Sequence, residues 1–431
     1  MKMSYRLLWL PVLLLMFFSR GVSRVAMAQR VADDTVQISL LTCAPGAEIY
    51  EAYGHTALRV NSLARPDDDY AYNFGWFSFS EPHFAWRFIL GKTAYTMAQQ
   101  SFPLFVTDYA SQGRRVTEQR LALTPQEALR VRRGLLDTLA VAGYEERAYR
   151  QGNFGAWYTR KARWRYHYSF LYDNCTTRAV RTITDAIKAE GGHLEWPSLQ
   201  GSAQQLTQRA MLHDYTAASP WGDFGQNLML AAETDKIYTA LEMAQLSFLP
   251  YYALDYFDKA LVCRADGSRR PLVAETVEIP MIAPTVELPT PSPITPVVAA
   301  VVLLAVAIVL TWQERRRRWV RLAFAFDLLT MTLRGLVGCL LLILVLWSLH
   351  PGVHHNWLLL IMSPLPLVGI AVKCVLRRRG CDYYNYLPAV AALLLLAAIV
   401  AGVQRVPTPI IFVACTLLVR AYQPYALSRK V

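Results

Sequence analysis

The residues best suited to chemistry lie in the segment from Phe170 to Val180, which reads FLYDNCTTRAV. Apolar residues follow Cys175 at helical spacing, and Asp173 or Asn174 just before it is a natural helix N-cap. This pattern predicts that Cys175 lies in the first turn of a helix. There the helix dipole lowers the pKa of a thiol, and free backbone N–H groups can hold an oxyanion. The alternative is an inert, buried cysteine.

A thiolate nucleophile needs an imidazole, and His55 has the most favourable sequence context for that role. It follows Gly54 and precedes an alternating stretch, which predicts a strand that starts just after a glycine turn. Residues 70–75, with the sequence YAYNFG, predict the next strand, and antiparallel pairing would place Asn73 near His55. An amide in that position orients the imidazole, as the third member of a catalytic triad does. We therefore expect Cys175, His55 and Asn73 to form one site.

The number of cysteines and the lack of metal-binding motifs narrow the kinds of chemistry that the chain could perform. Cys43, Cys175 and Cys263 are an odd number of thiols in the part of the chain before residue 280. A disulfide between Cys43 and Cys263 would leave Cys175 free, although the sequence alone does not select that pairing. The sequence has no H-E-x-x-H or C-x-x-C pair and no phosphate-binding glycine loop, so we expect neither a metal nor a cofactor.

The elements that must position these residues divide the chain into four parts. Residues 1–28 have a basic start, a short apolar core and an A-x-A site, which predict a signal peptide. Residues 29–270 have a globular composition and predict a folded domain, which contains Cys175, His55 and Asn73. Residues 271–296 are rich in proline and predict an extended linker, and residues 297–431 predict a membrane domain. Its five hydrophobic segments are approximately 297–312, 322–349, 357–376, 386–403 and 409–421.

Loop charges predict how these segments cross the membrane. Arginine clusters within 315–321 and 377–379, together with the basic C-terminus, fall on alternate sides of the series. The positive-inside rule puts the clusters in the cytoplasm and the globular domain outside it. In the second segment, Asp327 and Arg334 are spaced to share a helix face, so they either pair or reach separately toward the cytoplasmic surface.

Composition excludes two broad classes of protein. Of the 431 residues, 54% are hydrophobic and 18% are charged, which excludes intrinsic disorder and a wholly soluble enzyme. The formal net charge of +12 comes from the first segment and the hydrophobic C-terminal part, while the globular region is nearly neutral. This distribution is typical of membrane topology, so we expect no nucleic-acid partner.

Taken together, the motifs resemble a known family. A histidine on a first strand, a polar residue on the next and Asn-Cys opening a later helix resemble the circularly permuted papain-like (NlpC/P60) superfamily. The motifs at Tyr53–Thr56, Tyr72–Gly75, Tyr172–Arg178 and Phe248–Pro250 resemble more closely the Lnb-type lipoprotein N-acyltransferases of Bacteroides-like bacteria. The segment His350–Leu367 resembles an extracytoplasmic loop and the next helix of the same family.

The resemblance implies an α+β, circularly permuted papain-like domain in the periplasm, followed by an all-α, five-helix domain in the inner (cytoplasmic) membrane. It implies that Cys175 takes an acyl chain from a membrane phospholipid as a thioester and passes it to the α-amine of a diacylated lipoprotein. His55 would accept the thiol proton, and Asn73 would orient the ring. Support of the substrate or the oxyanion is then expected from the neighbouring motif residues Asn174, Tyr53, Tyr72, Asp173 and Arg178.

Two other functions fit the same motifs. The first is a membrane-tethered cysteine amidase or peptidase that acts on cell-wall peptide, because the same fold hosts such enzymes. The second is a binding or assembly module in which Cys175 is merely buried. An amidase needs a wet, peptide-wide groove, whereas an acyltransferase needs an apolar slot that opens toward the bilayer.

Overall fold

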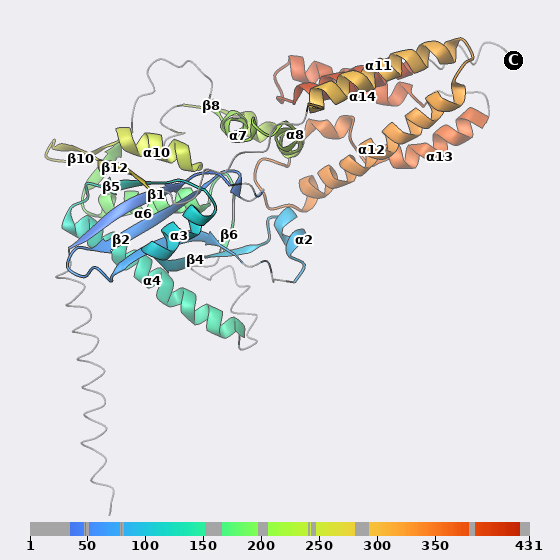
Figure 1. The fold of residues 1–431 in the computed structure, drawn as a ribbon. Helices are drawn as coiled ribbons and strands as arrows, with labels where there is room; N and C mark the ends of the chain where they lie inside the picture. The colour runs from blue at the N-terminus through green and yellow to red at the C-terminus, as the bar shows by residue number, and fades with distance from the viewer. Residues whose placement is uncertain are drawn as a thin grey trace, which may run out of the picture.

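The computed structural model describes residues 35–46, 48, 51–77, 79, 82–150, 166–196, 206–239, 242, 247–280, 293–378 and 384–422. The predicted signal peptide and residues 281–292 of the predicted linker lie outside the described residues. The described chain forms a mixed α/β domain that is followed by a helical membrane domain (Figure 1).

An antiparallel sheet is the base of the α/β domain. Within the described chain it has seven strands, in the order β12-β5-β1-β2-β3-β4-β6. Their bounds are β1 (Val36–Cys43), β2 (His55–Ser62), β3 (Asp69–Trp76), β4 (Ala94–Ser101), β5 (Val116–Leu121), β6 (Tyr166–His167) and β12 (Val273–Ile279). Strands β1 to β4 form a meander, and β5 returns to pair with the free side of β1. Because β12 pairs with β5, the sheet continues beyond residue 270, where we expected the domain to end.

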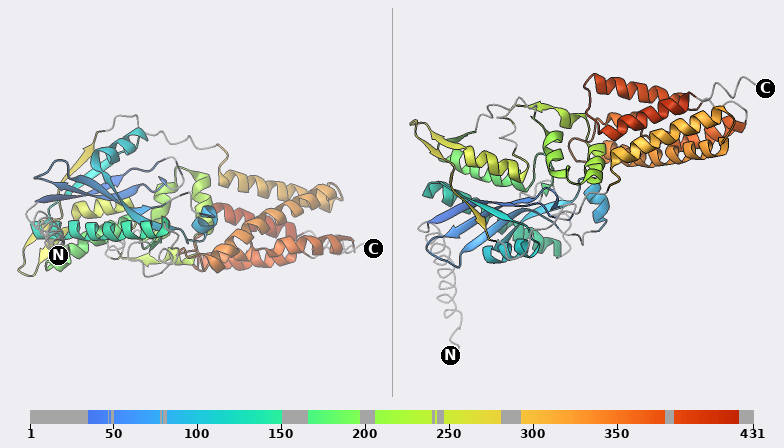
Figure 2. Two further views of the ribbon diagram at one scale, coloured as in Figure 1. Left: turned by 90° about the horizontal axis from the view of Figure 1, so that it is seen from below. Right: turned by 45° about the horizontal axis from the view of Figure 1, so that its top comes forward.

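Helices cover both faces of this sheet (Figure 2). One face carries α4 (Pro125–Arg150), α6 (Cys175–Ala189) and α10 (Pro250–Lys259), and the other carries α3 (Phe102–Ser111). The alternation of side chains along β2 explains this layering. Leu58 and Val60 point into the main core with α4 and α6, whereas Ala57 packs on the side of α3.

Smaller elements lie around the main sheet and toward the membrane helices. They are α2 (Phe84–Ile89), β7 (Gly192–Glu195), β8 (Leu206–Thr207), α7 (Gln208–Thr216), α8 (Pro220–Met229), η3 (Ala232–Asp235), β9 (Ile237–Tyr238), β10 (Leu261–Arg264) and β11 (Arg269–Pro271). Strands β11, β10 and β7 form a second sheet, and β8 pairs with β9. Helices α7 and α8 lie beside the membrane domain (Figure 1).

The membrane domain contains, among the described residues, three apolar helical stretches long enough to cross a bilayer. They are α11 (Pro296–Arg315), α12 (Val320–Trp347) and the stretch formed by η4 (Trp357–Leu360) and α13 (Leu365–Arg378). Two shorter apolar helices follow, α14 (Tyr386–Val400) and α15 (Thr408–Ala421). Each predicted hydrophobic segment therefore coincides with apolar helix, and three of them are long enough to span by themselves.

Asp327 and Arg334, inside the membrane domain, have separate partners. Asp327 pairs with Arg420 of α15, with Nε 2.7 Å from Oδ1, and with Lys373 of α13 at 3.1 Å. Arg334 instead donates to the carbonyl of Ile361 at 3.0 Å. The direct pairing of Asp327 with Arg334 that the sequence left open is not formed, because helical spacing fixes the face of a residue but not which neighbouring helix lies opposite.

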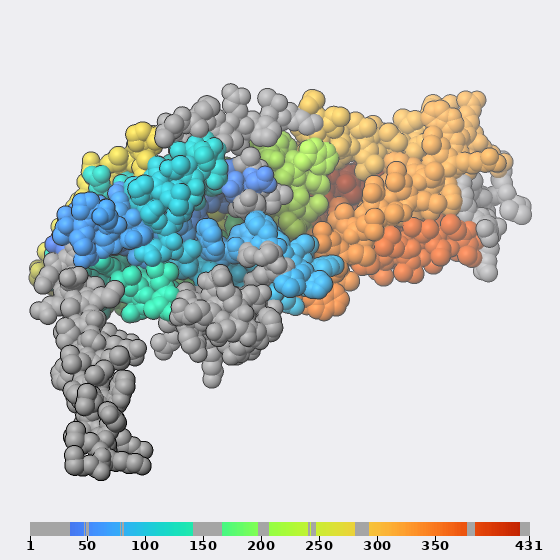
Figure 3. Space-filling model, turned by 60° about the horizontal axis from the view of Figure 1, so that its bottom comes forward, coloured from blue at the N-terminus to red at the C-terminus, as the bar shows by residue number. Residues whose placement is uncertain are grey.

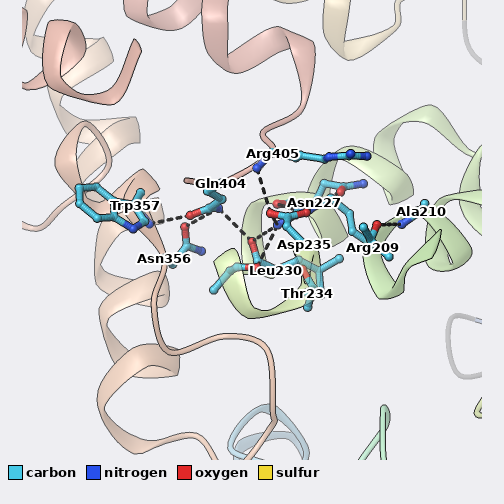
Figure 4. A network of polar contacts seen from close by, with 12 residues as sticks. Arg209, Ala210, Asn227, Leu230, Thr234, Asp235, Asn356, Trp357, Gln404 and Arg405 are labelled. Atoms are coloured by element: carbon cyan, nitrogen blue, oxygen red, sulfur yellow. Dashed lines mark hydrogen bonds and ion pairs between the residues drawn. The ribbon is translucent and has the colours of Figure 1, made fainter. Parts of the chain in front are cut away.

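Polar contacts join the two domains beside α8. Asp235 of η3 accepts from the backbone N–H of Arg405, between α14 and α15, with the nitrogen 2.9 Å from Oδ2. Gln404, between α14 and α15, donates to the carbonyl of Leu230 at 3.2 Å and accepts from the N–H of Trp357 at 2.8 Å (Figure 4). Because these groups are mostly buried, their hydrogen bonds favour one orientation of the α/β domain on the membrane helices.

A second set of hydrogen bonds between the domains, called here the seam, joins α2 to the loop after α12, where the early and late parts of the chain meet (Figure 3). The N–H of Leu349 donates to the carbonyl of Leu90 at 2.8 Å, and the His350 Nε2 lies 2.9 Å from the carbonyl oxygen of Phe88. Gly91 has a φ of +66°, and a Cβ there would lie 3.0 Å from the backbone nitrogen of His350. A side chain at Gly91 would therefore disturb the seam.

Candidate functional site

Cys175 is the first residue of α6, as the capping pattern predicts. Asn174 is the N-cap: its Oδ1 accepts from the N–H of Thr177 at 2.9 Å, and Thr177 Oγ1 accepts from the N–H of Asn174 at 2.8 Å. The Asn174 side-chain amide also donates to the carbonyls of Phe170, at 2.8 Å, and Phe248, at 2.7 Å. These four bonds fix the first turn of α6 and therefore the position of the thiol at the positive end of the helix.

Strands β2 and β3 bring His55 and Asn73 together, as predicted. Ala57 pairs with Asn73 in the antiparallel register, so His55 is a diagonal neighbour of Asn73 on the same face. His55 Nε2 lies 3.1 Å from Asn73 Oδ1, which accepts the hydrogen bond and leaves Nδ1 for the thiol. Gly54 has a φ of +72°, and a Cβ there would lie 2.4 Å from the carbonyl oxygen of Cys43. Only glycine fits this turn, which starts β2 at His55.

The electrostatics of the site favour the thiolate of Cys175, whose side chain is largely buried. Burial by itself raises the pKa of this thiol, but the charge of His55 and its hydrogen bond lower the pKa to about 7. The backbone of Thr56 and the hydroxyl of Tyr168 act in the same direction. The Tyr168 oxygen lies 3.8 Å from Sγ. A substantial fraction of Cys175 is therefore ionised at neutral pH.

The other two cysteines of the α/β domain have the opposite electrostatics. Burial raises the pKa of Cys43 to about 12, and burial together with the Glu195 carboxylate raises the pKa of Cys263. Cys43 ends β1 of the main sheet and Cys263 lies in β10 of the second sheet, and both are free thiols. The disulfide between them, which the sequence allowed but did not select, is not formed, because the number of cysteines carries no information about the distance between them. Of the three thiols, Cys175 alone has a lowered pKa.

Aromatic side chains that the sequence analysis did not assign to the site surround it. The ring of Tyr109, on α3, stacks on the imidazole of His55 with the centroids 6.5 Å apart. Burial raises the pKa of Tyr168 well above its ordinary value, so its hydroxyl stays protonated beside Cys175 and can donate to the thiolate. No spacing rule identifies these tyrosines, because aromatic residues are common in any core.

Tyr53 and Tyr72, two tyrosines that the sequence analysis assigned to the site, differ in how deeply they are buried in the α/β domain. The hydroxyl of Tyr53 donates to Gln226 Oε1 on α8, and its ring meets the ring of Phe170 edge-on at 4.7 Å. Tyr53 thus lies between the histidine strand, the segment before Cys175 and the helix beside the membrane domain. Tyr72 is buried in the main core, where its hydroxyl accepts from the Gln99 side chain at 3.1 Å. The contacts described for Tyr72 are those of a core residue.

The predicted polar residues Asp173 and Arg178 pair with each other. Arg178 Nη2 lies 2.7 Å from Asp173 Oδ2, and the guanidinium lies 3.3 Å from the ring centroid of Tyr166. This places the ion pair across the first turns of α6, where it supports the strand that carries Tyr166. Its described contacts are those of residues that position the site.

Metal binding has no geometric support in the part of the chain that the structure describes. Among those residues, no group of three or more His, Cys, Asp or Glu side chains comes together as a metal would require. The groups that do come together are a thiol, an imidazole and a side-chain amide, which suit nucleophilic chemistry.

The fold and the site define a membrane-anchored protein with a thiol–imidazole–amide site in an α/β domain outside the bilayer. Two family models match the chain: the Lnb N-terminal periplasmic domain over residues 24–199 and the Lnb transmembrane domain over residues 289–430. The chain therefore belongs to the Lnb family, with a periplasmic domain and a transmembrane domain, and the resemblance seen in its motifs is confirmed. Comparison with curated proteins and with solved structures gives no match.

Proposed function

We propose that this protein is a lipoprotein N-acyltransferase with Cys175 as its nucleophile. The observation that carries the proposal is the arrangement of Cys175 at the start of α6 with His55, whose hydrogen bond lowers the pKa of the thiol and whose ring is oriented by Asn73, in a chain anchored by its own apolar helices. Membership of the Lnb family supports it. In this proposal the periplasmic domain is circularly permuted papain-like (NlpC/P60), and five helices cross the inner membrane.

The first half-reaction would load the enzyme. His55 takes the thiol proton, and Sγ attacks an ester carbonyl carbon of a membrane phospholipid, forming the C–S bond. The N–H groups in the first turn of α6, held by Asn174, stabilise the oxyanion. The ester C–O bond then breaks, and His55 gives its proton to the leaving hydroxyl of the lysophospholipid. The acyl chain remains on Cys175 as a thioester.

The second half-reaction would transfer the acyl chain. The α-amine of a diacylglyceryl-cysteine lipoprotein attacks the thioester carbonyl, and the amide C–N bond forms as the C–S bond breaks. His55 accepts a proton from the amine and returns it to the leaving thiolate of Cys175. The membrane helices confine both lipid substrates near the site, which lowers the entropic barrier. Burial of Cys175, whose exposed fraction is 7%, would protect the thioester from hydrolysis.

The remaining residues of the predicted site take supporting roles in this proposal. Asn174 holds the turn that carries the oxyanion donors. The pair of Asp173 and Arg178 positions Tyr166 next to this turn, and Tyr53 connects the site to α8. Tyr72 acts through the core beneath β3.

The test is direct detection of the acyl-enzyme. The full chain in phospholipid nanodiscs should gain the mass of one acyl group on the peptide with Cys175, and neutral hydroxylamine should remove it. Cys175→Ala should give no adduct, whereas the matched variant Cys263→Ala should give the same adduct as the wild type. A synthetic diacylglyceryl-cysteine peptide should discharge the adduct and become triacylated.

Two outcomes would count against the proposal. A folded wild-type protein that never acquires an acyl adduct from phospholipid would contradict the thioester mechanism. Cleavage of cell-wall peptides by the wild type, lost in Cys175→Ala, would favour the amidase instead.

A further inference from the structure

Helix α2 exposes large aromatic side chains next to the membrane domain. Trp86 is 54% exposed, and Phe88 is also exposed. The seam of hydrogen bonds from Leu349 and His350 to the end of α2 fixes this helix beside the end of α12 that faces the periplasmic domain. Gly91 allows the close approach. The aromatic face of α2 therefore lies at the level where the membrane helices emerge.

Exposed tryptophans mark that level independently. Trp347 ends α12 and is 58% exposed. Trp357, the first residue of η4, and Trp221, in α8, are also exposed. The Trp221 indole N–H donates to the carbonyl of Ile294, just before α11, at 2.8 Å. Tryptophans collect at the membrane–water interface because one end of the ring system is apolar and the other donates a hydrogen bond. Trp86 adds α2 to this set of exposed tryptophans.

A series of aromatic rings leads from α2 to the thiol. Phe84 stacks on Phe77 with the centroids 5.6 Å apart, and Phe77 lies 5.1 Å from Tyr95 of β4. Tyr95 lies 4.5 Å from Tyr168, whose hydroxyl is 3.8 Å from the Sγ of Cys175. Each ring packs on the next, so an unbroken series of aromatic side chains runs from α2 to the nucleophile.

We propose that the aromatic face of α2 docks on the periplasmic leaflet of the membrane, and that the ring series from Phe84 to Tyr168 guides an acyl chain from the bilayer to Cys175. The occupant is a lipid surface, because α2 is continuous with the interfacial tryptophans of the membrane domain. Two basic residues of the same segment, Arg87 and Lys92, suit lipid phosphates at that level. The guiding of the acyl chain rests on the proposed function, whereas the docking of α2 does not.

Photocrosslinking tests the docking without any need for activity. The full chain in phospholipid nanodiscs would carry p-benzoylphenylalanine in place of Trp86 and would be irradiated and weighed intact. The matched control is the same substitution at Leu63, an exposed apolar residue at the opposite end of β2 from His55. A phospholipid adduct at position 86 and none at position 63 is expected. Equal adducts at both positions, or none at position 86, would overturn the docking.

A comparison of two acyl donors tests the path. The rate of thioester formation would be measured from bilayer phospholipid and from the water-soluble ester p-nitrophenyl butyrate. In Trp86→Glu, the ratio of the bilayer rate to the soluble rate should fall about tenfold, as expected for losing the burial of one large apolar side chain. Leu63→Glu should keep both rates.

The outcomes separate this inference from the proposed function. An unchanged ratio in Trp86→Glu would overturn the path. A wild type that forms no thioester from either donor would overturn the proposed function and the path with it, while the crosslink at position 86 would still decide whether α2 docks on the membrane.

Discussion

Replacing His55 should raise the pKa of the Cys175 thiol, because His55 supplies the largest effect that lowers it. In the native site the pKa is lowered from the ordinary value of 9.0 to about 7 although burial acts in the opposite direction. His55→Ala removes both the charge and the hydrogen bond and leaves the burial. The pKa should therefore rise to about 9 or above.

The size of the effect follows from these two pKa values. At pH 7 the thiolate fraction falls from about one half to about one hundredth when the pKa rises from about 7 to about 9. Each remaining thiolate becomes about eightfold more nucleophilic, because the Brønsted coefficient is about 0.4–0.5. The alkylation rate of Cys175 at pH 7 should therefore fall about sixfold, less than the loss of thiolate alone would give.

The assay is alkylation of Cys175 by iodoacetamide as a function of pH, followed by the mass of the peptide that contains it. Since the thiolate forms as the pH rises through the pKa, the wild-type rate should rise with a midpoint at about 7. The midpoint should move to about 9 or above in His55→Ala and stay in place in His193→Ala, a histidine in β7 of the second sheet. A wild-type midpoint near 9, or the same midpoint in folded His55→Ala, would refute the reasoning.

Three further substitutions have defined outcomes. Asn73→Ala should lower kcat for acyl transfer by about tenfold to a hundredfold through misorientation of the imidazole, and kinetics equal to the wild type would contradict the triad. Asn174→Ala should lower the free energy of unfolding by at least about 1 kcal/mol, because α6 loses its N-cap, and an unchanged Tm would argue against that. Arg420→Leu should destabilise the membrane domain by about 3–5 kcal/mol, because Asp327 stays buried with one partner fewer. Adding Asp327→Asn should restore part of that loss in thermal unfolding in detergent, and no recovery would contradict the explanation.

The three central residues were predictable because a local rule positions each of them. Gly54 starts the strand at His55, antiparallel pairing of neighbouring strands brings Asn73 beside it, and the N-cap Asn174 puts Cys175 in the first turn of α6. In each case the rule acts over a few residues or between consecutive strands. That is the range over which sequence patterns determine geometry.

Most of the features that escaped prediction depend on segments far apart in the chain. Tyr109 reaches the site through the packing of α3 on the sheet, which no residue spacing encodes. Tyr168 is only seven residues before Cys175, but its contact depends on the irregular turn between β6 and α6, which has no periodic pattern. The partner of Asp327 lies 93 residues later, at Arg420, so it depends on how the membrane helices rotate against one another. The β12 strand was missed for the same reason, because its pairing with β5 is a long-range contact at the edge of the sheet.

The most direct test of the central claim is made on the lipoproteins of the cell. Their N-terminal peptides would be weighed in cells that lack this protein and are complemented with the wild type or with Cys175→Ser. The account predicts that the wild type adds the mass of one acyl group to the α-amine and that Cys175→Ser does not. Lipoproteins that are equally triacylated in all these strains would contradict N-acylation by this protein.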